Sequence, residues 1–392
     1  MKPKISFKRK TILIAAIPLT LLVFFYAVVL FILIKNDGSS ADPLYSGPII
    51  PSEEQQPIQN SFGHSTEAMD VVKGLDLTGK IIVMTGGHTG TGREAAKAFL
   101  SVGAKVIALA PDIEWAKSNL KGLKNVEIEY LDLLIPSSIE SFTQKFLKSN
   151  RQIDILVNSA GIHNTPLQRD ARGFERQFAT NVLGHFELTV KLIPALKKAN
   201  GARIVNLSSR GHRLSNVIFE DINFEHTPYN GMVAYAQSKT ALSLLTVKED
   251  ELLQKYHIRA FAVHPGPIPT SDLFAGSMVG YSPEYKVNLS KLLAVTLRTF
   301  YATEILNFLR RPKNIGDIYK TVKQGGATTV WAAVSSDLNG KGGLYLEDCN
   351  IAPIVPIDSK APFGVRPWAL DKNAADKIWK ISESMTGIYY KE

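Results

Sequence analysis

Residues 80–110 have the sequence KIIVMTGGHTGTGREAAKAFLSVGAKVIALA, and this stretch decides the fold. A short apolar run ends in glycines at 86 and 87, apolar residues then recur at helical spacing over 93–103, and a second apolar run follows at 105–110. Strand, glycine turn, helix and strand in that order make a βαβ unit. Such a unit places its two strands parallel in one sheet.

Four more apolar runs continue this alternation along the chain, VEIEYLDL (126–133), IDILVNSAG (153–161), ARIVNLSS (202–209) and IRAFAVHPG (258–266). The order predicts an α/β protein with an open, doubly wound parallel sheet of the Rossmann type. Sheets of this kind bind ligands at the carboxyl ends of their strands. Functional residues are therefore expected directly after each predicted strand.

Composition limits the classes of partner. The chain has 392 residues, 45% of them apolar, which suits one large domain with appendages. The net charge is +9, but five basic residues lie within the first ten positions, Lys2, Lys4, Lys8, Arg9 and Lys10. The remainder is only mildly basic, so nucleic acid is not an expected partner. Cys349 is the only cysteine and the eight histidines lack paired ligand spacing, so neither a disulfide nor a metal site is predicted.

Residues 11–34, TILIAAIPLTLLVFFYAVVLFILI, contain no charged side chain. This length is enough to cross a bilayer core of about 30 Å. A cleaved signal peptide is the alternative, but large residues continue up to Lys35, which favours an uncleaved single-pass anchor. The basic cluster precedes the span, so the positive-inside rule predicts a cytosolic N-terminus and a large domain across the membrane. In a eukaryote that space would be the lumen of the endoplasmic reticulum.

The sequence divides the chain into five segments: a basic flank (1–10), the anchor (11–34), a linker or docked strap (35–75), the large α/β domain (76–350) with a lid or pocket segment (270–325), and a C-terminal tail that packs on the domain (351–392). The linker is rich in Pro, Ser, Gln and Gly, which favours loop structure. The number of copies in an assembly is not predicted.

The residues that follow the predicted strands carry the functional signal. Glycines in TGGHTGTG (85–92) would let the backbone approach a pyrophosphate lying on the N-terminus of the next helix. In AYAQSKTALSLL (234–245), Tyr235 and Lys239 stand four residues apart and share one helix face. Alone, this pair has two interpretations, a lysine snorkelling beside a half-buried tyrosine or a functional pair. The order of the other motifs favours the second.

The motifs TGGHTGTG, LDL, NSAG, NVLGHF, RIVNLSSRGH, YAQSK and HPGPIPT occur in an order that resembles the short-chain dehydrogenase/reductase family, closest to the branch with retinol dehydrogenases and WW-domain oxidoreductases. The resemblance covers about residues 75–350, and no WW domain is present. It implies a catalytic set of Tyr235, Lys239, Ser209 and Asn181. It also implies cofactor-binding positions at Gly86, Thr89, Gly90, Thr91, Gly92, Arg93, Asp132, Leu133, Asn158, Ala160, Gly161, Tyr235, Lys239, Pro265, Gly266, Ile268 and Thr270.

In this set Tyr235 would transfer the proton of the substrate hydroxyl. A free tyrosine has a pKa near 10, so we expect Lys239, one turn away, to lower it and to contact the nicotinamide ribose. Ser209 would donate to the developing alkoxide, and Asn181 would complete a water-mediated proton relay to the lysine.

The end of the second strand bears on the choice of cofactor. NAD-preferring relatives usually have an acidic residue where this chain has Ala110, and NADP-preferring relatives often have an arginine where it has Pro111. Asp112 is a competing ligand for the ribose diol, and Arg93 could meet a 2′-phosphate. These residues favour NADP(H) over NAD(H).

Residues 291–314, KLLAVTLRTFYATEILNFLRRPKN, have apolar residues at helical spacing, which fits core packing, a greasy lid or a helix resting on a bilayer. Together with the anchor, this segment favours a lipophilic alcohol or aldehyde as substrate, such as a retinoid, polyprenoid, sterol or fatty alcohol. A catalytically silent nucleotide-binding scaffold of the same fold is the alternative function. A sugar-nucleotide epimerase is disfavoured because no long C-terminal substrate domain follows HPG (264–266).

Overall fold

The computed structural model describes residues 54–268, 271, 273 and 319–391. The predicted anchor (11–34), the 291–314 helix and Thr270 lie outside these residues. Within the described ranges, no helix is both long enough and apolar enough to cross a membrane.

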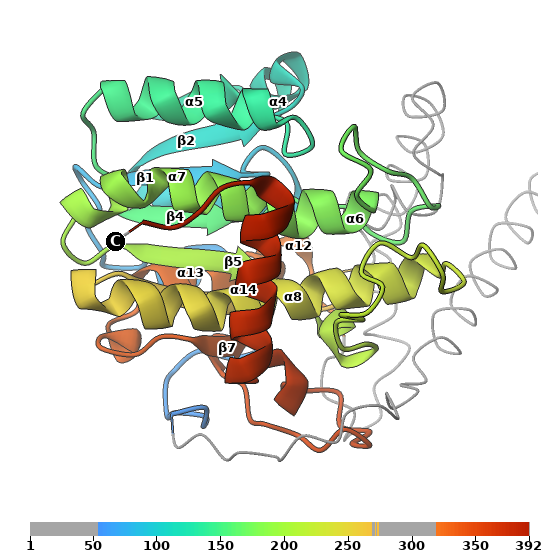
Figure 1. Cartoon of the computed structure of the whole chain (residues 1–392). Coiled ribbons are helices and arrows are strands. Elements are labelled where there is room, and N and C mark those ends of the chain that lie inside the picture. The colour runs from blue at the N-terminus through green and yellow to red at the C-terminus, as the bar shows by residue number, and fades with distance from the viewer. Residues whose placement is uncertain (1–53, 269–270, 272, 274–318, 392) are drawn as a thin grey trace, which may run out of the picture. The chain divides into compact units, whose positions relative to one another are not determined.

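Eight strands form one sheet in the part of the chain that the structure describes, in the order β3-β2-β1-β4-β5-β6-β7-β8 (Figure 1). Their bounds are Ile81–Thr85 (β1), Lys105–Ala110 (β2), Val126–Tyr130 (β3), Ile155–Asn158 (β4), Arg203–Leu207 (β5), Arg259–His264 (β6), Leu344–Glu347 (β7) and Asn350–Ile351 (β8). Strands β1 to β7 are parallel, and β8 is antiparallel to β7. The predicted doubly wound Rossmann-type sheet is confirmed. Its strand order reverses between β1 and β4, where such sheets bind ligands.

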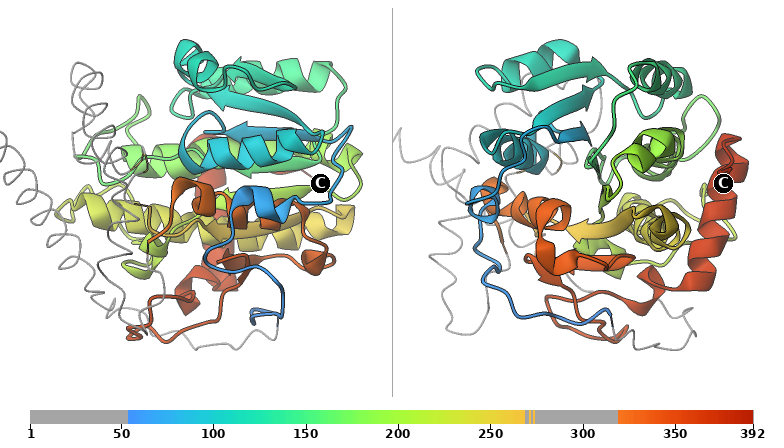
Figure 2. Two further views of the ribbon diagram at one scale, coloured as in Figure 1. Left: turned by 180° about the vertical axis from the view of Figure 1, so that it is seen from behind. Right: turned by 90° about the vertical axis from the view of Figure 1, so that its left-hand side faces the viewer.

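Helices cover both faces of the sheet (Figure 2). The longer ones are α3 (Gly90–Ser101) and α13 (Ala327–Val334) on one face, and α5 (Pro136–Lys148), α7 (Gly184–Lys198) and α8 (Gly231–Leu253) on the other. Helix α14 (Lys372–Thr386) packs on the outer side of α8. Its Trp379 packs edge-on against Phe186 of α7. The shorter helices are α2 (Ala68–Val71), α4 (Ile113–Asn119), α6 (Arg176–Phe178) and α12 (Val322–Gly325). The single turns are a π turn η1 (Ala179–Leu183) and the 3₁₀ turns η2 (Arg210–Arg213), η3 (Gln254–Tyr256), η4 (Ser336–Leu338) and η5 (Pro367–Ala369).

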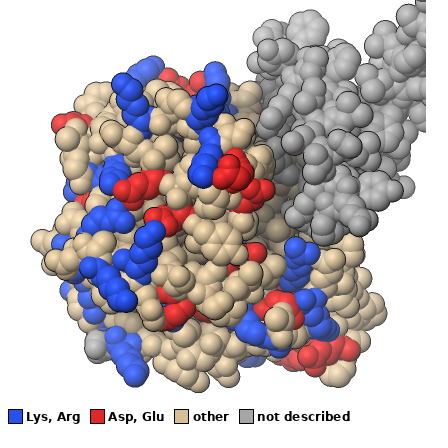
Figure 3. Space-filling view, turned by 90° about the horizontal axis from the view of Figure 1, so that it is seen from above, with Lys and Arg blue, Asp and Glu red and all other residues tan. Residues whose placement is uncertain are grey.

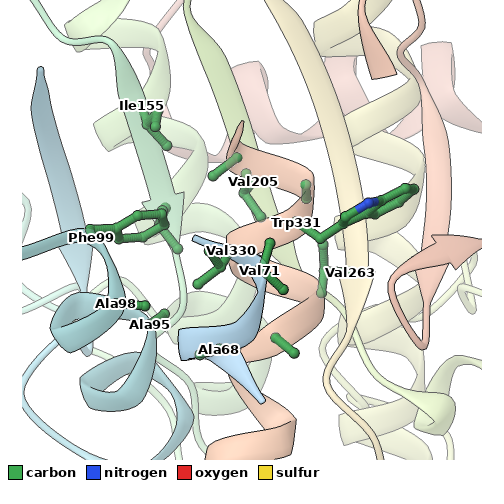
Figure 4. Packing of buried hydrophobic residues seen from close by; sticks show 14 of the residues in the cluster. Ala68, Val71, Ala95, Ala98, Phe99, Ile155, Val205, Val263, Val330 and Trp331 are labelled. Atoms are coloured by element: carbon green, nitrogen blue, oxygen red, sulfur yellow. The ribbon is translucent and has the colours of Figure 1, made fainter. Parts of the chain in front are cut away.

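One apolar cluster joins α3 and α13 to the sheet (Figure 4). Phe99 of α3, Trp331 of α13 and Val205 of β5 are fully buried in it. Side chains alternate across a strand, so the neighbouring Ile204 faces the helices of the opposite layer. Val71 of α2 also belongs to this cluster, so the last part of the predicted linker contributes to the core.

The predicted linker is docked as a strap from residue 54 onward. The Gln55 amide donates to the carbonyl oxygens of Tyr345 and Ala352, both at 2.7 Å, and accepts from the Tyr345 N–H at 3.0 Å. Asn350 exchanges two 2.8 Å hydrogen bonds with the backbone of Ile58. These bonds hold the strap on β7 and β8.

Two described residues on either side of the stretch between β6 and α12 are hydrogen-bonded to each other. The Lys320 N–H donates a 2.9 Å hydrogen bond to the carbonyl oxygen of Pro267. The two ends of the intervening stretch are therefore adjacent.

On the face shown in Figure 3, basic and acidic side chains are interspersed. Exposed pairs such as Lys145 and Glu129, 2.7 Å apart, add little stability each. The absence of a nucleic-acid partner stays a prediction.

Candidate active site

The glycine-rich loop joins β1 to α3 at the point where the strand order reverses. Gly86 has φ +68°, and a Cβ there would lie 3.0 Å from the Ala160 nitrogen. A Cβ on Gly92 would lie 2.4 Å from the Gly86 oxygen, too close for any side chain. A Cβ on Gly90 would meet nothing within 4 Å, so the start of α3 is open there. This loop fits a pyrophosphate, because helix N-termini present unpaired N–H groups.

A buried histidine connects this loop to the π turn. The Thr85 hydroxyl accepts from the N–H groups of Ser159 and Ala160, at 2.9 and 3.0 Å, and contacts Nε2 of His185 at 2.9 Å. Nδ1 of His185 lies 3.0 Å from the carbonyl oxygen of Asn181, so Nδ1 carries the proton and Thr85 donates to Nε2. Burial lowers the pKa of His185 to about 4, which keeps it neutral. His185 belongs to the NVLGHF motif, but it is not among the residues predicted to form the site.

The side chain of Asn158 lies in a buried hydrogen-bond network, and its predicted role in cofactor binding stays a prediction. Its amide donates to Thr189 at 3.0 Å and to Asn206 at 2.7 Å, inside the layer between the sheet and α7 and α8. Asn206 in turn donates to the buried carboxyl of Glu249 at 2.6 Å. The Asn158 side chain is therefore committed to this network, and a contact with a dinucleotide would have to come from its backbone.

The predicted catalytic tyrosine, lysine and serine lie together at the end of β5. Helix α8 is N-capped by Asn230 and presents Tyr235 and Lys239 on one face, with the Lys239 nitrogen 5.7 Å from the centre of the tyrosine ring. The Lys239 Nζ donates a 2.7 Å hydrogen bond to the carbonyl oxygen of Leu207. The Ser209 hydroxyl is hydrogen-bonded to the Tyr235 phenol. Their assignment as catalytic residues stays a prediction.

Asn181 lies in the π turn and faces the same place. Its oxygen accepts from the Ile162 N–H at 2.9 Å, and its amide nitrogen donates to Ile162 O and Ser238 Oγ, both at 3.0 Å. A Cβ on Gly161 would lie 3.1 Å from Asn181 Oδ1 and 3.5 Å from Lys239 Nζ. Gly161 thus marks the point where the asparagine and the lysine converge. Regular α-helix periodicity does not reveal such a π turn in the sequence.

The pKa of Tyr235 is shifted in the opposite direction from the one expected, and that of Lys239 is shifted as well. Burial raises the pKa of Tyr235 to about 12, although its hydrogen bond with Ser209 acts to lower it. Burial also lowers the pKa of Lys239 to about 7. The expected lowering of the tyrosine pKa by Lys239 is not observed in this arrangement, because desolvation disfavours the charged form of both groups.

A second histidine, His163, packs against Tyr235 and is not among the predicted site residues. The rings of His163 and Tyr235 meet edge to face, with centroids 4.4 Å apart. Burial, assisted by the charge of Lys239, lowers the pKa of His163 to about 4. His163 follows the NSAG motif by two positions, and that place after a strand end is the signal that could have found it.

The candidate ribose ligands already have protein partners. Asp112 N-caps α4 by accepting a 2.9 Å hydrogen bond from the Trp115 N–H. Arg93 donates from Nε to the Asn119 carbonyl oxygen at 2.8 Å and keeps 32% of its side chain exposed. Ala110, at the end of β2, is fully buried.

After β3, Asp132 and Leu133 form a tight turn at the same edge of the sheet. The Asp132 carboxylate accepts from the Leu134 N–H at 2.9 Å, and the Leu133 oxygen would be 2.5 Å from a Cβ on Gly184. This contact holds the turn against the start of α7.

The loop after β6 closes against the glycine-rich loop. A Cβ on Gly325 would lie 2.2 Å from Ile268 Cδ1 and 2.6 Å from Thr91 Cγ2, so these side chains meet over a glycine. Gly266 has φ +93°, and a Cβ there would lie 2.5 Å from the buried side chain of Lys320. The predicted cofactor-binding positions from Gly86 to Arg93 therefore lie next to those from Pro265 to Ile268.

Known proteins resemble the chain over most of its length. A family model described as short chain dehydrogenase matches residues 80–276. Short-chain dehydrogenase/reductase prx1 of Penicillium roqueforti is 31% identical, over 82% of this chain and 90% of the relative. Human retinol dehydrogenase 12 is 32% identical, over 81% and 89%. A probable oxidoreductase of Streptomyces antibioticus is 36% identical, over 78% and 97%.

Solved structures agree with these relatives. An uncharacterized protein from Mycobacterium paratuberculosis has a TM-score of 0.60 and 26% identity, and the match covers 84% of this chain and 100% of that one. The Pseudomonas aeruginosa RhlG/NADP active-site complex has a TM-score of 0.50 at 22% identity, over 69% and 95%, and shows the fold alone. From the family match and these relatives, the chain belongs to the short-chain dehydrogenase/reductase family and is an NAD(P)-dependent alcohol dehydrogenase or carbonyl reductase.

Proposed function

We propose that this protein is a membrane-anchored, NADP(H)-preferring oxidoreductase that interconverts a lipophilic alcohol and its aldehyde or ketone. The observation that carries the proposal is the convergence of Ser209, Tyr235, Lys239 and Asn181 beside the glycine-rich loop. A chain that had lost its chemistry would have no reason to keep a phenol, an amine and a hydroxyl together in a buried site, where desolvation is costly.

The side chains have complementary roles in this proposal. At neutral pH the Tyr235 phenol is protonated, the form that donates a proton to a carbonyl oxygen during reduction. Ser209 donates to the same oxygen as negative charge develops on it. During oxidation the phenol must first be deprotonated, and the resulting phenolate accepts the proton of the substrate hydroxyl; a positive charge on Lys239 stabilises this phenolate. Asn181 holds the backbone of Ile162 beside the lysine and supports a water-mediated route for protons to solvent.

The dinucleotide supplies or accepts the hydride when bound. Gly86 and Gly92 let the loop fold tightly, because at each a Cβ would meet backbone atoms that already lie close, and the pyrophosphate would lie at the open start of α3 near Gly90. For the adenosine ribose, the proposed preference for NADP(H) rests on Ala110, where no carboxylate opposes a 2′-phosphate. Arg93 supports it, because its partly exposed guanidinium lies one position beyond the last glycine.

The substrate class rests on two independent indications. Residues 11–34 have the length and composition of a bilayer-spanning segment. The relatives include proteins named retinol dehydrogenase, whose name specifies a lipophilic alcohol. An enzyme held at a membrane meets lipophilic substrates where they are concentrated, and the endoplasmic reticulum with a lumenal catalytic domain is the proposed location.

The proposal is tested with the purified full-length chain in detergent or vesicles. We expect NADPH oxidation with retinaldehyde, a long-chain aldehyde or a polyprenal, and at least about tenfold lower kcat/KM with a short hydrophilic aldehyde, because burial of each CH₂ contributes about 0.8 kcal/mol. Equal turnover of short and long aldehydes would refute the lipophilic class, and no turnover with any carbonyl would refute the proposed reaction. A lipidomic comparison of cells with and without the protein then identifies the physiological substrate.

A further inference from the structure

The loop that carries Ser209 is held from behind by a histidine. Ser209 begins the 3₁₀ turn η2, and its side chain accepts from the Gly211 N–H at 3.0 Å. Its carbonyl oxygen lies 2.7 Å from Nδ1 of His212. His212 is fully buried, and the Tyr345 hydroxyl of β7 is 3.0 Å from the same nitrogen.

The partners of His212 determine its tautomer. The backbone N–H of Arg366 points at Nε2 from 3.1 Å and can only donate, so Nε2 carries no proton. The proton is therefore on Nδ1, which donates to the Ser209 carbonyl. Burial, with the charges of Arg213 and Arg366, lowers the pKa of His212 to about 3, so this neutral form persists across the working pH range.

The C-terminal segment that supplies Arg366 is fixed to the same loop by further bonds. Trp368 donates from Nε1 to the His212 carbonyl oxygen at 2.9 Å. Arg213, from the loop, and Arg366 both donate to the Ser359 carbonyl oxygen, at 3.1 and 2.8 Å. The bonds of Arg213 to Ser359, of Arg366 to His212 and of Trp368 to His212 each join parts of the chain that are more than a hundred residues apart, and together they leave the His212 ring little freedom.

A small displacement of this loop reaches the tyrosine directly. A Cβ on Gly211 would lie 2.7 Å from Tyr235 Cε1, so the loop backbone is in tight contact with the ring. On its other side the loop is held by His264, whose Nδ1 accepts the Arg210 N–H at 3.1 Å. The Ser209 hydroxyl thus depends on two buried neutral histidines.

We propose that His212 is a positioning residue, which transmits the packing of C-terminal residues 365–368 to Ser209 and sets the serine hydroxyl against Tyr235. The inference rests on the proposed role of Ser209. Because His212 touches neither proposed reacting group with its side chain, its loss lowers kcat without removing a site for the dinucleotide. The C-terminal tail thereby becomes part of the active-site framework.

Two conservative variants separate the two halves of this contact. In His212→Asn the amide nitrogen takes the place of Nδ1 and keeps the bond to Ser209, while the bond from Arg366 is lost. In His212→Gln the amide oxygen takes the place of Nε2 and keeps the bond from Arg366, while the donor to Ser209 is lost. His212→Asn loses the bond from Arg366, whereas His212→Gln loses the contacts of Nδ1 with Ser209 and Tyr345, so both should lower the urea midpoint and His212→Gln by somewhat more.

Both variants are made in the full-length chain. We would measure kcat and the KM for NADPH, with the aldehyde that the wild-type protein reduces fastest, and the urea midpoint of unfolding. We expect kcat of His212→Asn within about threefold of wild type and kcat of His212→Gln lower by about tenfold or more, because misplacement of a reacting group by less than 1 Å is costly. KM for NADPH should stay within about twofold in both variants. His257→Asn, at an exposed left-handed position that asparagine tolerates, is the matched control.

The outcomes distinguish the two claims. Equal loss of kcat in the Asn and Gln variants, in proportion to lost stability, overturns the positioning role and leaves a structural one. Unchanged kcat in both overturns it as well, while the proposed function stands. A wild-type protein without turnover refutes the proposed function, and the positioning role with it.

Discussion

Lys239 Nζ donates a 2.7 Å hydrogen bond to the carbonyl oxygen of Leu207, the last residue of β5. Leu207 is only two positions before Ser209, so this bond couples helix α8 to the strand end that delivers the serine. The amine is thereby held at a fixed distance from the phenol, with no acidic partner among the residues that the structure describes, and burial lowers its pKa to about 7. The predictions below test the consequences of this arrangement and of the surrounding fold.

Tyr235→Phe should lower kcat by about 10²–10⁴-fold, because the phenol is the proposed proton donor and acceptor. Binding of NADPH should be almost unchanged, since most of the dinucleotide would contact the glycine-rich loop. Steady-state kinetics and titration of tryptophan fluorescence measure the two effects. Tyr389→Phe, at an exposed tyrosine, is the control. Near wild-type turnover in Tyr235→Phe would rule out the assignment.

Ala110→Asp should reverse the preference for cofactor. A carboxylate at the end of β2 would repel the 2′-phosphate of NADPH and accept hydrogen bonds from the ribose of NADH. Dissociation constants for both dinucleotides should move in opposite directions, each by roughly tenfold, or about 1.4 kcal/mol. If the wild-type protein already binds NADH more tightly, the ribose ligand must instead be Asp112.

Gly211→Ala should lower kcat by about 10–100-fold with little change in NADPH affinity. The added methyl would lie 2.7 Å from Tyr235 Cε1, so the ring or the loop must move. Gly63→Ala is the comparison, because a Cβ there would meet nothing within 4 Å. Equal kcat in the two variants would show that the loop relaxes without disturbing the tyrosine.

Glu249→Gln should make stability less dependent on pH. Burial raises the pKa of Glu249 to about 8, so between pH 4.5 and 8 the folded state holds a proton that the unfolded state has released. Stability from this group is complete below pH 4.5 and is lost as pH rises toward 8. Glutamine keeps the bond from Asn206 and cannot ionise, so its advantage over wild type should grow by on the order of 2 kcal/mol from pH 5 to pH 8.

Urea unfolding at pH 5 and pH 8 measures this difference. Glu251→Gln, at a neighbouring and half-exposed carboxylate, should show no such growth. If the advantage of Glu249→Gln is the same at both values, the carboxyl does not titrate in this window.

Sealed microsomes test the orientation expected from the basic flank before residues 11–34. The catalytic domain should resist added protease until detergent opens the vesicles. Digestion without detergent would place the domain in the cytosol, and a feature other than flanking charge would then determine the topology. A lumenal marker protein in the same vesicles reports whether they are sealed.

The sequence predicted the parts of the fold that depend on local patterns. Apolar runs such as 105–110 form parallel strands, and the glycines of 85–92 lie at the switch in strand order. Strand β7 was not predicted, and it joins the sheet by pairing with β6, about eighty residues earlier in the chain. For residues 35–75 the sequence left a linker and a docked strap as alternatives, because Gln55 meets its partners 290 and 297 residues further along the chain.

In the candidate active site, too, the local patterns were predicted and the long-range contacts were not. Tyr235, Lys239 and Ser209 are recognisable from spacing and order, whereas the contacts that orient them are not. The bond from Arg366 to His212 spans 154 residues, and no local pattern records it. The pKa of Tyr235 also depends on burial by the whole surrounding fold, so the neighbouring lysine alone was a poor guide to its direction.

The hydrogen bond between the Lys320 N–H and the Pro267 carbonyl has a consequence for protein engineering. A stretch whose two ends are joined at one point can change in length at little entropic cost, since doubling a loop adds only about 0.6 kcal/mol. Residues 269–318 are therefore a natural unit for exchange between relatives. A chimaera spliced at Pro267 and Lys320 should preserve this hydrogen bond, and its choice of alcohol would test whether the predicted lid segment determines the substrate.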